Sequence, residues 1–118
     1  MRRDLDLIRL ILLDVEGESA ADLSSYSRDQ LNFHKALIKE AGLADGIVNF
    51  PTGKDADPDI PDMAILTKLT WEGHEFINKA KSEKTWVKAK HLVLRSGASL
   101  SLEAMKIALS EALKLILK

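Results

Sequence analysis

The chain has 118 residues, of which 46% are hydrophobic and 30% charged, and its formal net charge is −1 at pH 7. This size and balance fit one soluble domain with its own core, so we expect residues 1–118 to form a single domain. The absence of cysteine excludes disulfide bonds, thiolate metal sites and a catalytic thiol. The near-zero charge lacks the basic excess of a typical nucleic-acid-binding protein, so function has to be sought in local patterns.

No segment holds the ~18 consecutive apolar residues that a membrane-spanning helix needs. Arg2 and Arg3 precede an apolar stretch, as in a signal peptide, but acidic residues interrupt that stretch and no small-residue cleavage site follows. We therefore expect no membrane partner and a cytoplasmic location.

Two helices are predicted in the first part of the chain. Apolar residues at spacings of three and four predict a helix over residues 3–16, which Gly17 ends. After a polar loop over residues 18–26, Ser27 and Gln30 have the spacing of a capping box and predict a second helix that begins at Ser27. Gly42 follows this helix, where a left-handed cap would lie. The apolar face of the second helix holds Leu31, His34, Leu37, Ile38 and Ala41.

A β-hairpin is predicted next. Ile47, Val48 and Phe50 suggest a short strand, and the β-branched and apolar residues of 63–70 suggest a second strand. Residues 51–62 hold all three prolines, which predicts a long and irregular hairpin tip.

Helices are predicted over most of the remaining chain. Thr70 can cap a helix that begins at Trp71, and Ser82 or a neighbour restarts it until Gly97. Ser101 caps a final helix from Leu102 to about Leu117. We expect both tryptophans to pack in the core or between helices, because tryptophan buries a large apolar area. The buried stripe of the second of these helices is predicted to be Trp86, Ala89 and Val93.

The order of these elements predicts the fold class. Helix, helix, hairpin, helix, helix is an α+β arrangement, mostly helical, and a capped helix followed by a hairpin is how a winged helix is built. We therefore predict a winged-helix-like domain, with a helix-helix-wing core over residues 1–81 and a C-terminal helical extension over residues 82–118.

Three blocks of residues resemble a known family. They are residues 1–13, Phe33-His34 with residues 37–43, and the run Leu-Thr-Trp-Glu-Gly-His-Glu-Phe-Ile at residues 69–77. Together they resemble an uncharacterised bacterial and phage family, domain of unknown function 2513. The second block is also similar to the recognition-helix end of arsenic-responsive and multiple-antibiotic-resistance repressors. The resemblance implies a winged-helix-like domain of phage or prophage type and implies no catalytic residues, and fold analogy alone supplies none.

The second helix is the first candidate for DNA binding. The side opposite its apolar face holds Arg28, Asn32, Lys35 and Lys39. Arginine pairs with guanine, asparagine pairs with adenine, and lysine neutralises phosphate, so these residue types suit a recognition helix. An ordinary solvated helix face has the same composition, and this alternative remains open.

A second basic face is predicted further along the chain. Lys84, Lys88, His91 and Arg95 follow one another at helical spacing, and Lys81 extends the row. Between Lys79 and Arg95 there are six Lys or Arg residues against Glu83 alone. Such a face could contact phosphate or an acidic protein surface, and a solvated face is again the alternative.

The hairpin tip is acidic and opposes a DNA-contacting wing. It carries Asp55, Asp57, Asp59 and Asp62 against Lys54, and carboxylates near phosphates are repulsive. The alternating aspartates resemble a calcium loop, but Ile60 and Leu66 stand where an EF-hand needs glycine and glutamate, so no metal site is expected.

No catalytic constellation is found. His74 and Glu75 begin a zincin-like motif, but Asn78 stands where its second histidine would be. There is no phosphate-binding glycine loop and no nucleophile elbow. We expect His34, on an apolar helix face, to be a hydrogen-bonded core histidine, and we expect no enzyme activity and no cofactor.

The last helix has a long apolar face of Leu102, Met105, Leu109, Ala112 and Ile116, which Leu113, Leu115 and Leu117 widen. This face either folds back onto the first helix or pairs with another subunit, and a homodimer is favoured because palindromic DNA sites need a two-fold axis. The predicted function is therefore a non-catalytic DNA-binding or transcription-regulating winged-helix protein. The alternative is a protein-protein interaction module that modulates a host or phage complex.

Overall fold

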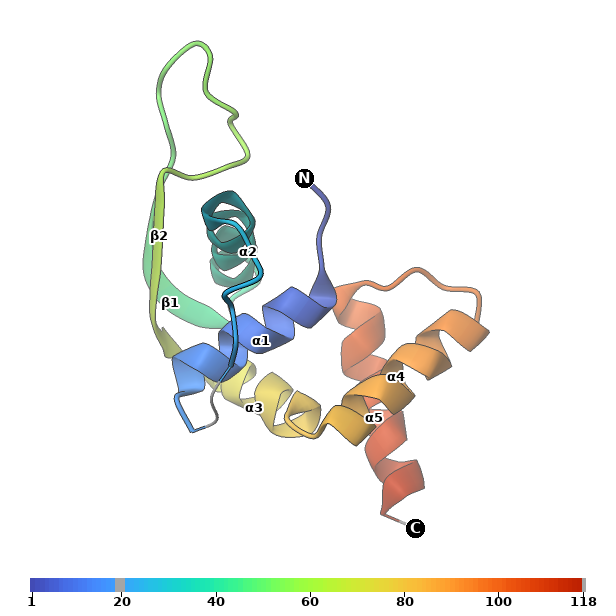
Figure 1. Ribbon diagram of the computed structural model, residues 1–118. Coiled ribbons are helices and arrows are strands. Elements are labelled where there is room, and N and C mark those ends of the chain that lie inside the picture. The colour runs from blue at the N-terminus through green and yellow to red at the C-terminus, as the bar shows by residue number, and fades with distance from the viewer. Residues whose placement is uncertain (19–20, 118) are drawn as a thin grey trace. The chain divides into compact units, whose positions relative to one another are not determined.

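The computed structural model describes residues 1–18 and 21–117 and contains, within these ranges, five helices and one two-stranded antiparallel sheet (Figure 1). The predicted mostly helical α+β class is confirmed. The chain packs as two compact units, Met1–His74 and Glu75–Lys118. The division falls inside a helix, whereas the sequence suggested a boundary between core and extension at residues 81 and 82.

Helix α1 spans Leu5–Glu16 and forms the centre of the first unit. The Asp4 carboxylate accepts hydrogen bonds from the backbone N–H groups of Asp6 (2.9 Å) and Leu7 (3.2 Å), so the helix begins two residues later than predicted. Gly17 ends the helix with a left-handed φ of 78°, as predicted. The buried side chains of α1 are Leu7, Ile8, Ile11, Leu12 and Leu13.

Helix α2 spans Arg28–Glu40 and packs on α1. The predicted capping box is confirmed, since the Ser27 hydroxyl accepts from the N–H of Gln30 (3.1 Å) and the Gln30 side chain accepts from the N–H of Ser27 (2.8 Å). Gly42 follows with a φ of 76°, and the N–H of Leu43 donates to the Ile38 carbonyl (3.1 Å). These local bonds explain why both ends of this helix were predictable.

Strands β1 (Ala44–Asn49) and β2 (Met63–Leu69) form an antiparallel hairpin in the register Ala44↔Leu69 to Asn49↔Met63. The register shifts between Asp45 and Gly46, where a side chain on Gly46 would overlap the carbonyl of Ile65. The predicted first strand began too late, and Phe50 lies exposed in the loop rather than in the strand.

Helix α3 spans Trp71–Ala80 and begins at a Thr70 cap, as predicted. The Thr70 hydroxyl accepts from the N–H of Gly73 (3.1 Å) and donates to the Gly42 carbonyl (2.6 Å). A side chain at Gly73 would overlap the Leu43 carbonyl, so glycine lets the helix approach the start of β1. The prediction that Trp71 packs in the interior is wrong. Its side chain is 76% exposed, because the first helical position points away from the side that α3 buries.

Helices α4 (Glu83–Arg95) and α5 (Leu102–Ile116) pack together in the second unit. Ser82 and Ser101 cap them, each accepting a backbone N–H three residues on. Trp86, Ala89 and Val93 are buried as predicted, and Trp86 meets Phe76 edge to face with ring centroids 6.2 Å apart. The side chains that α5 buries are Met105, Ala108, Leu109 and Ala112.

Candidate binding surfaces

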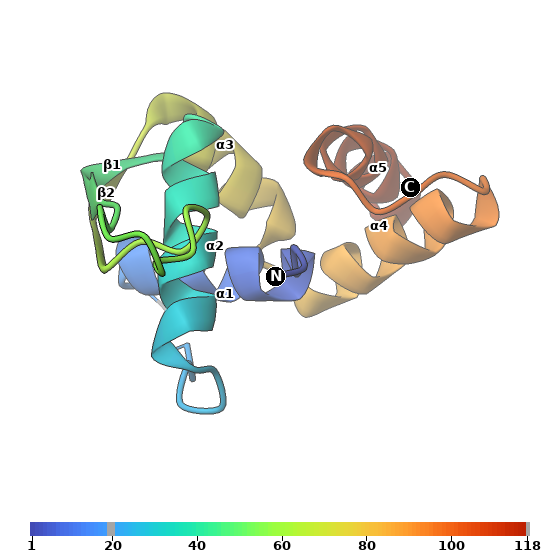
Figure 2. The same ribbon diagram turned by 90° about the horizontal axis from the view of Figure 1, so that it is seen from above.

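The first candidate surface, the outer side of α2, is partly covered by the hairpin loop of residues 50–62. The Arg28 guanidinium donates to the Asp62 carbonyl (2.9 Å), and the Asn32 amide donates to the carbonyls of Pro61 (3.3 Å) and Asp62 (3.4 Å). Asn32 is only 7% exposed and Pro61 is fully buried. The loop lies over α2 in Figure 1 and again in the view from above in Figure 2.

The four residues predicted to bind DNA therefore have different surroundings. Arg28 and Asn32 hold the loop, whereas Lys35 is half-buried and Lys39 is exposed. Helical periodicity placed Asn32 opposite the apolar face, and the structure shows that this position is also buried, beneath the loop. The loop contact joins residues 34 positions apart, so no local pattern around α2 could have revealed it.

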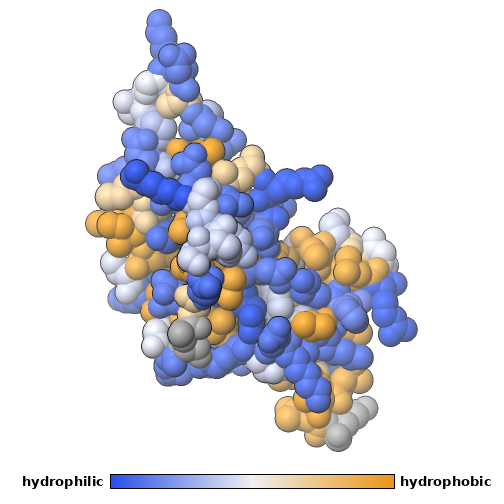
Figure 3. Space-filling model, viewed as in Figure 1, coloured by the Kyte–Doolittle hydropathy of each residue, from blue (hydrophilic) through white to orange (hydrophobic). Residues whose placement is uncertain are grey.

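The hairpin loop itself is polar and acidic. The Asp57 carboxylate accepts from the N–H of Asp59 (2.9 Å), which orders the tip internally. Hydrophilic atoms form this tip in the space-filling view (Figure 3). A hollow of about 390 Å³ lies between the loop and α2, with Arg28, Asp29 and Asp57 in its wall. Within the described ranges, no three His, Cys, Asp or Glu residues come together in a way that could hold a metal ion.

The His34 side chain connects the start of α1 to α2 through hydrogen bonds. Its ring is buried, Nε2 accepts from the backbone N–H of Asp4 (2.8 Å), and Nδ1 lies 2.7 Å from the Gln30 carbonyl. These partners assign the neutral tautomer with the proton on Nδ1. The predicted hydrogen-bonded core histidine is confirmed, and both ring nitrogens are occupied by the fold. His74 and His91 are exposed.

The second candidate surface is the outer side of α4, and here the predicted row lies in solvent. Lys84, Lys88, His91 and Arg95 are all exposed, while Lys81 is half-buried. Among the described residues, no carboxylate forms an ion pair with Lys84, Lys88 or Arg95. The row therefore presents positive charge that the second unit does not neutralise locally.

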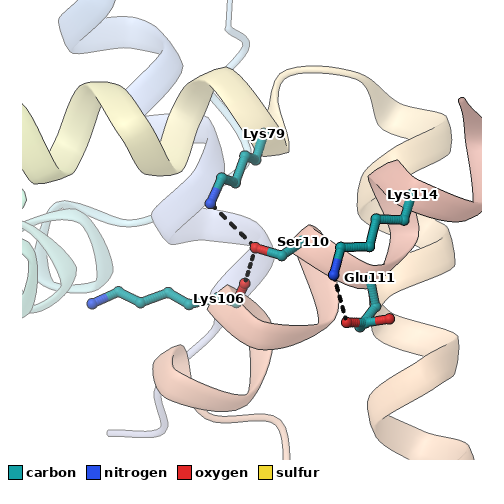
Figure 4. Close-up of polar contacts among 5 residues, drawn as sticks. All are labelled: Lys79, Lys106, Ser110, Glu111 and Lys114. Carbon is teal, nitrogen blue, oxygen red and sulfur yellow. Dashed lines mark hydrogen bonds and ion pairs between the residues drawn. The ribbon is translucent and has the colours of Figure 1, made fainter.

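The lysines of α5 differ from this row, because each of them has a close polar neighbour. Lys106 pairs with Glu103 (3.3 Å) and Lys114 with Glu111 (3.5 Å), both at i,i+3 spacing. The Ser110 hydroxyl donates to the Lys106 carbonyl (3.3 Å) and accepts from the Lys79 ammonium (3.2 Å), which ties α3 to α5 (Figure 4). The positive charge of the second unit that lacks such pairing is thus concentrated on α4.

An apolar groove runs along the line where α4 and α5 meet. One hollow of about 370 Å³ lies between the C-terminal half of α4 and α5, and a neighbouring hollow of about 600 Å³ lies between the N-terminal half of α4 and the end of α5. Leu115 lines both hollows, so we treat them as one α4–α5 groove. The apolar side chains along it include Val87 (44% exposed), Ile107 (68%) and Leu115 (49%). Apolar atoms surround the C-terminal end of α5 in Figure 3.

The basic side of this groove was predicted from the sequence, and so was Leu115 as part of the widened apolar face of the last helix, but Ile107 was not predicted. Met105, Leu109 and Ala112, which were predicted as one apolar face, are buried against the second unit's interior. Ile107 and Leu115 lie on another side of the helix and remain exposed. The signal was present in the spacing of Ala104, Ile107, Ala108, Glu111 and Leu115, all of which line the groove.

Two groups near the start of α2 have shifted pKa values, and neither lies on a candidate surface. Hydrogen bonds from the Ser24 hydroxyl and backbone N–H lower the pKa of Asp22. Burial, with smaller contributions from the charges of Asp4 and Asp6, raises the pKa of Tyr26. No helix in the described ranges combines the length and the apolarity that crossing a bilayer requires.

Comparison with known proteins supplies a family. The model of the family described as "Hypothetical protein (DUF2513)" matches residues 2–99. An "Uncharacterized protein" of Haemophilus influenzae is 29% identical over 114 residues, which cover 90% of each chain. No solved structure matches this chain. Since the family model spans most of the sequence, the chain belongs to the DUF2513 family.

Proposed function

We propose that this protein is a non-catalytic binding protein that acts through a protein partner, and that the α4–α5 groove is the surface it uses. The observation that supports this proposal is the exposure of Ile107, Leu115 and Val87 along a hollow seam of the second unit. Exposed apolar side chains in a groove, with polar residues at the rim, are typical of protein interaction sites. A DNA surface, in contrast, is predominantly polar and positively charged.

The test is capture of a partner from lysate of a bacterium that carries the gene, with the full chain as bait and nuclease present. We expect a defined set of proteins that the Ile107→Glu and Leu115→Glu variants lose. The Lys39→Glu variant, changed at an exposed position in the first unit, serves as the control and should retain them. Capture that is equal for the groove variants and the parent chain would contradict the proposal.

Double-stranded DNA is the second candidate ligand. It is favoured by the row on α4, for which the described part of the chain shows no ion pair, by the exposed Lys39, and by a helix-helix-hairpin order that we propose to be winged-helix-like. The burial of Asn32 beneath an acidic loop, and the hydrogen bond that holds the exposed Arg28 to the same loop, count against base reading through the first half of α2. A phage or prophage type belongs to this second proposal, with the family resemblance as its support. A cytoplasmic location and a two-fold dimer through α5 belong to it as well. The absence of cysteine supports the location, and the two-fold axis of palindromic DNA sites supports the dimer.

DNA binding predicts a steep salt dependence. A titration of duplex DNA should give a log–log slope that falls by about one for each phosphate-contacting lysine replaced by alanine. The Lys84→Ala/Lys88→Ala/Arg95→Ala chain tests the row on α4, and the Arg28→Ala/Lys35→Ala/Lys39→Ala chain tests α2. A duplex that the parent protein leaves unshifted at low salt would eliminate this candidate.

A further inference from the structure

We infer that the occupant of the α4–α5 groove is an amphipathic helix with acidic residues beside its apolar stripe, supplied by another protein. This inference rests on the proposed function and names the chemistry of the partner. It follows from three properties of the groove, namely its shape, its charge, and the mismatch it presents to a second copy of this chain.

The shape of the groove suits a helix. On α4 its lining residues run from Lys84 to Ser96, and on α5 they run from Ala104 to Ile116. A helical stretch of 13 residues is about 20 Å long, so the lining on α4 extends over a length of about three to four turns of a partner helix. Val87, Ile107 and Leu115 are spread along the seam, where they can meet apolar residues at i, i+3 or i+4, and i+7 of such a helix.

The charge of the groove selects an acidic partner. At one end of the groove, between the N-terminal half of α4 and the C-terminal end of α5, the wall includes Lys84, Lys88 and His91. Glu111 is the acidic residue in the wall of the other end, and it is paired with Lys114. A partner helix with glutamate or aspartate beside its apolar stripe would neutralise the row on α4, whereas a basic helix would be repelled.

A second copy of the chain fits the groove less well. In a two-fold dimer the same patch lies on both sides of the interface, so two net-positive grooves would face each other. Lys84 and Lys88 have no ion-pair partner among the described residues, and a symmetric contact would add further positive charge to their surroundings. Like charges brought together across an interface oppose association.

The experiment measures binding of three designed helical peptides, each of about 18 residues, to the full chain by fluorescence anisotropy. The first has a leucine stripe at i, i+3, i+4, i+7 flanked by glutamate, the second has lysine in place of glutamate, and the third has serine in place of leucine. We expect the first peptide to bind at least about tenfold more tightly than the other two, a difference of about 1.4 kcal/mol. Binding of the first peptide should weaken as salt is added.

Variants of the chain localise the binding. The Lys84→Glu/Lys88→Glu chain should prefer the lysine peptide over the glutamate peptide, and Ile107→Asp should weaken binding of both. These positions are exposed, so circular dichroism should show unchanged folding. The Lys54→Glu/Lys68→Glu chain carries the same change of charge on exposed positions of the first unit and should bind like the parent.

Three results would overturn the inference. The first is equal binding of the acidic and basic peptides, and the second is binding that Ile107→Asp leaves intact. The third is a parent chain that sediments as a dimer and that Ile107→Asp converts to a monomer, because the groove would then belong to a second copy. If the peptides fail while capture from lysate still depends on Ile107 and Leu115, the partner chemistry is wrong and the proposed function stands. If capture fails as well, both are wrong.

Discussion

Helices α2 and α4 carry similar rows of side chains with different surroundings. Both helices have 13 residues and a serine cap, and in each the row follows the spacing i, i+4, i+7, i+11. The rows are Arg28, Asn32, Lys35, Lys39 on α2 and Lys84, Lys88, His91, Arg95 on α4. On α2 the first two side chains bind the carbonyls of the hairpin loop, whereas on α4 all four lie in solvent.

The difference teaches that helical spacing identifies residues on one side of a helix but not what covers that side. On α2 Arg28 and Asn32 act within the fold, because they donate hydrogen bonds to carbonyls of the hairpin loop, where Pro61 is buried. On α4 the same spacing leaves charge available to a ligand. Four predictions test this distinction between covered and uncovered positions, from the largest expected effect on stability to the smallest.

The two tryptophans give the largest contrast. Trp86→Ala removes a buried indole that contacts Phe76 and should lower the free energy of unfolding by about 3–5 kcal/mol. Trp71→Ala removes a side chain that is 76% exposed and should change it by less than about 0.5 kcal/mol. Urea denaturation followed by far-ultraviolet circular dichroism measures both. Equal losses for the two variants would contradict the different burial of these side chains.

Gly73→Ala tests the close approach of α3 to the start of β1. The added methyl group would overlap the Leu43 carbonyl, and since backbone lies on both sides the free energy of unfolding should fall by about 1–3 kcal/mol. Gly53→Ala is the control, because no atom lies within 4 Å of a side chain added there. Circular dichroism melts of the two variants should therefore separate, and a stabilising effect of Gly73→Ala would disprove the contact.

Asn32→Ala tests the covering of α2 by the loop. It leaves the carbonyls of Pro61 and Asp62 without the amide donor and should cost about 1–2 kcal/mol in urea denaturation. Lys39→Ala, on the same row but exposed, should cost less than about 0.5 kcal/mol. Faster proteolysis of residues 50–62 in Asn32→Ala alone would add independent support. If both variants are as stable as the parent, the loop does not depend on Asn32.

The smallest expected effect on the free energy of unfolding concerns Tyr26 and arises in alkaline solution. Its pKa is raised above 10.0 by burial and by Asp4 and Asp6, so the folded state favours the neutral phenol more than the unfolded state does. Stability is then independent of this group below the unfolded pKa and falls as the pH rises through the folded pKa. Denaturation between about pH 9 and 12 should show a loss that Tyr26→Phe reduces. An identical alkaline loss in Tyr26→Phe would assign it to other groups.

Local chemistry accounts for the elements that the sequence predicted. The Ser27–Gln30 capping box, the glycine ends of α1 and α2, and the serine caps of α4 and α5 all act within about four residues, which is the range that a sequence pattern covers. Apolar periodicity likewise located the buried stripe of α4, and the isolated polar position on the apolar face of α2 identified His34.

Contacts between residues far apart in the sequence decided which of the predicted faces are buried and which are exposed. The exposure of Trp71, the burial of Asn32 and the open seam of the α4–α5 groove each depend on which element covers another, and the Arg28–Asp62 contact spans 34 residues. The sequence by itself determined where the helices and strands lie and which residues share a side, since these follow from bonds within one turn or one strand. Only the tertiary structure decided which charged row remained open, because covering a surface requires the chain to return to it from far away.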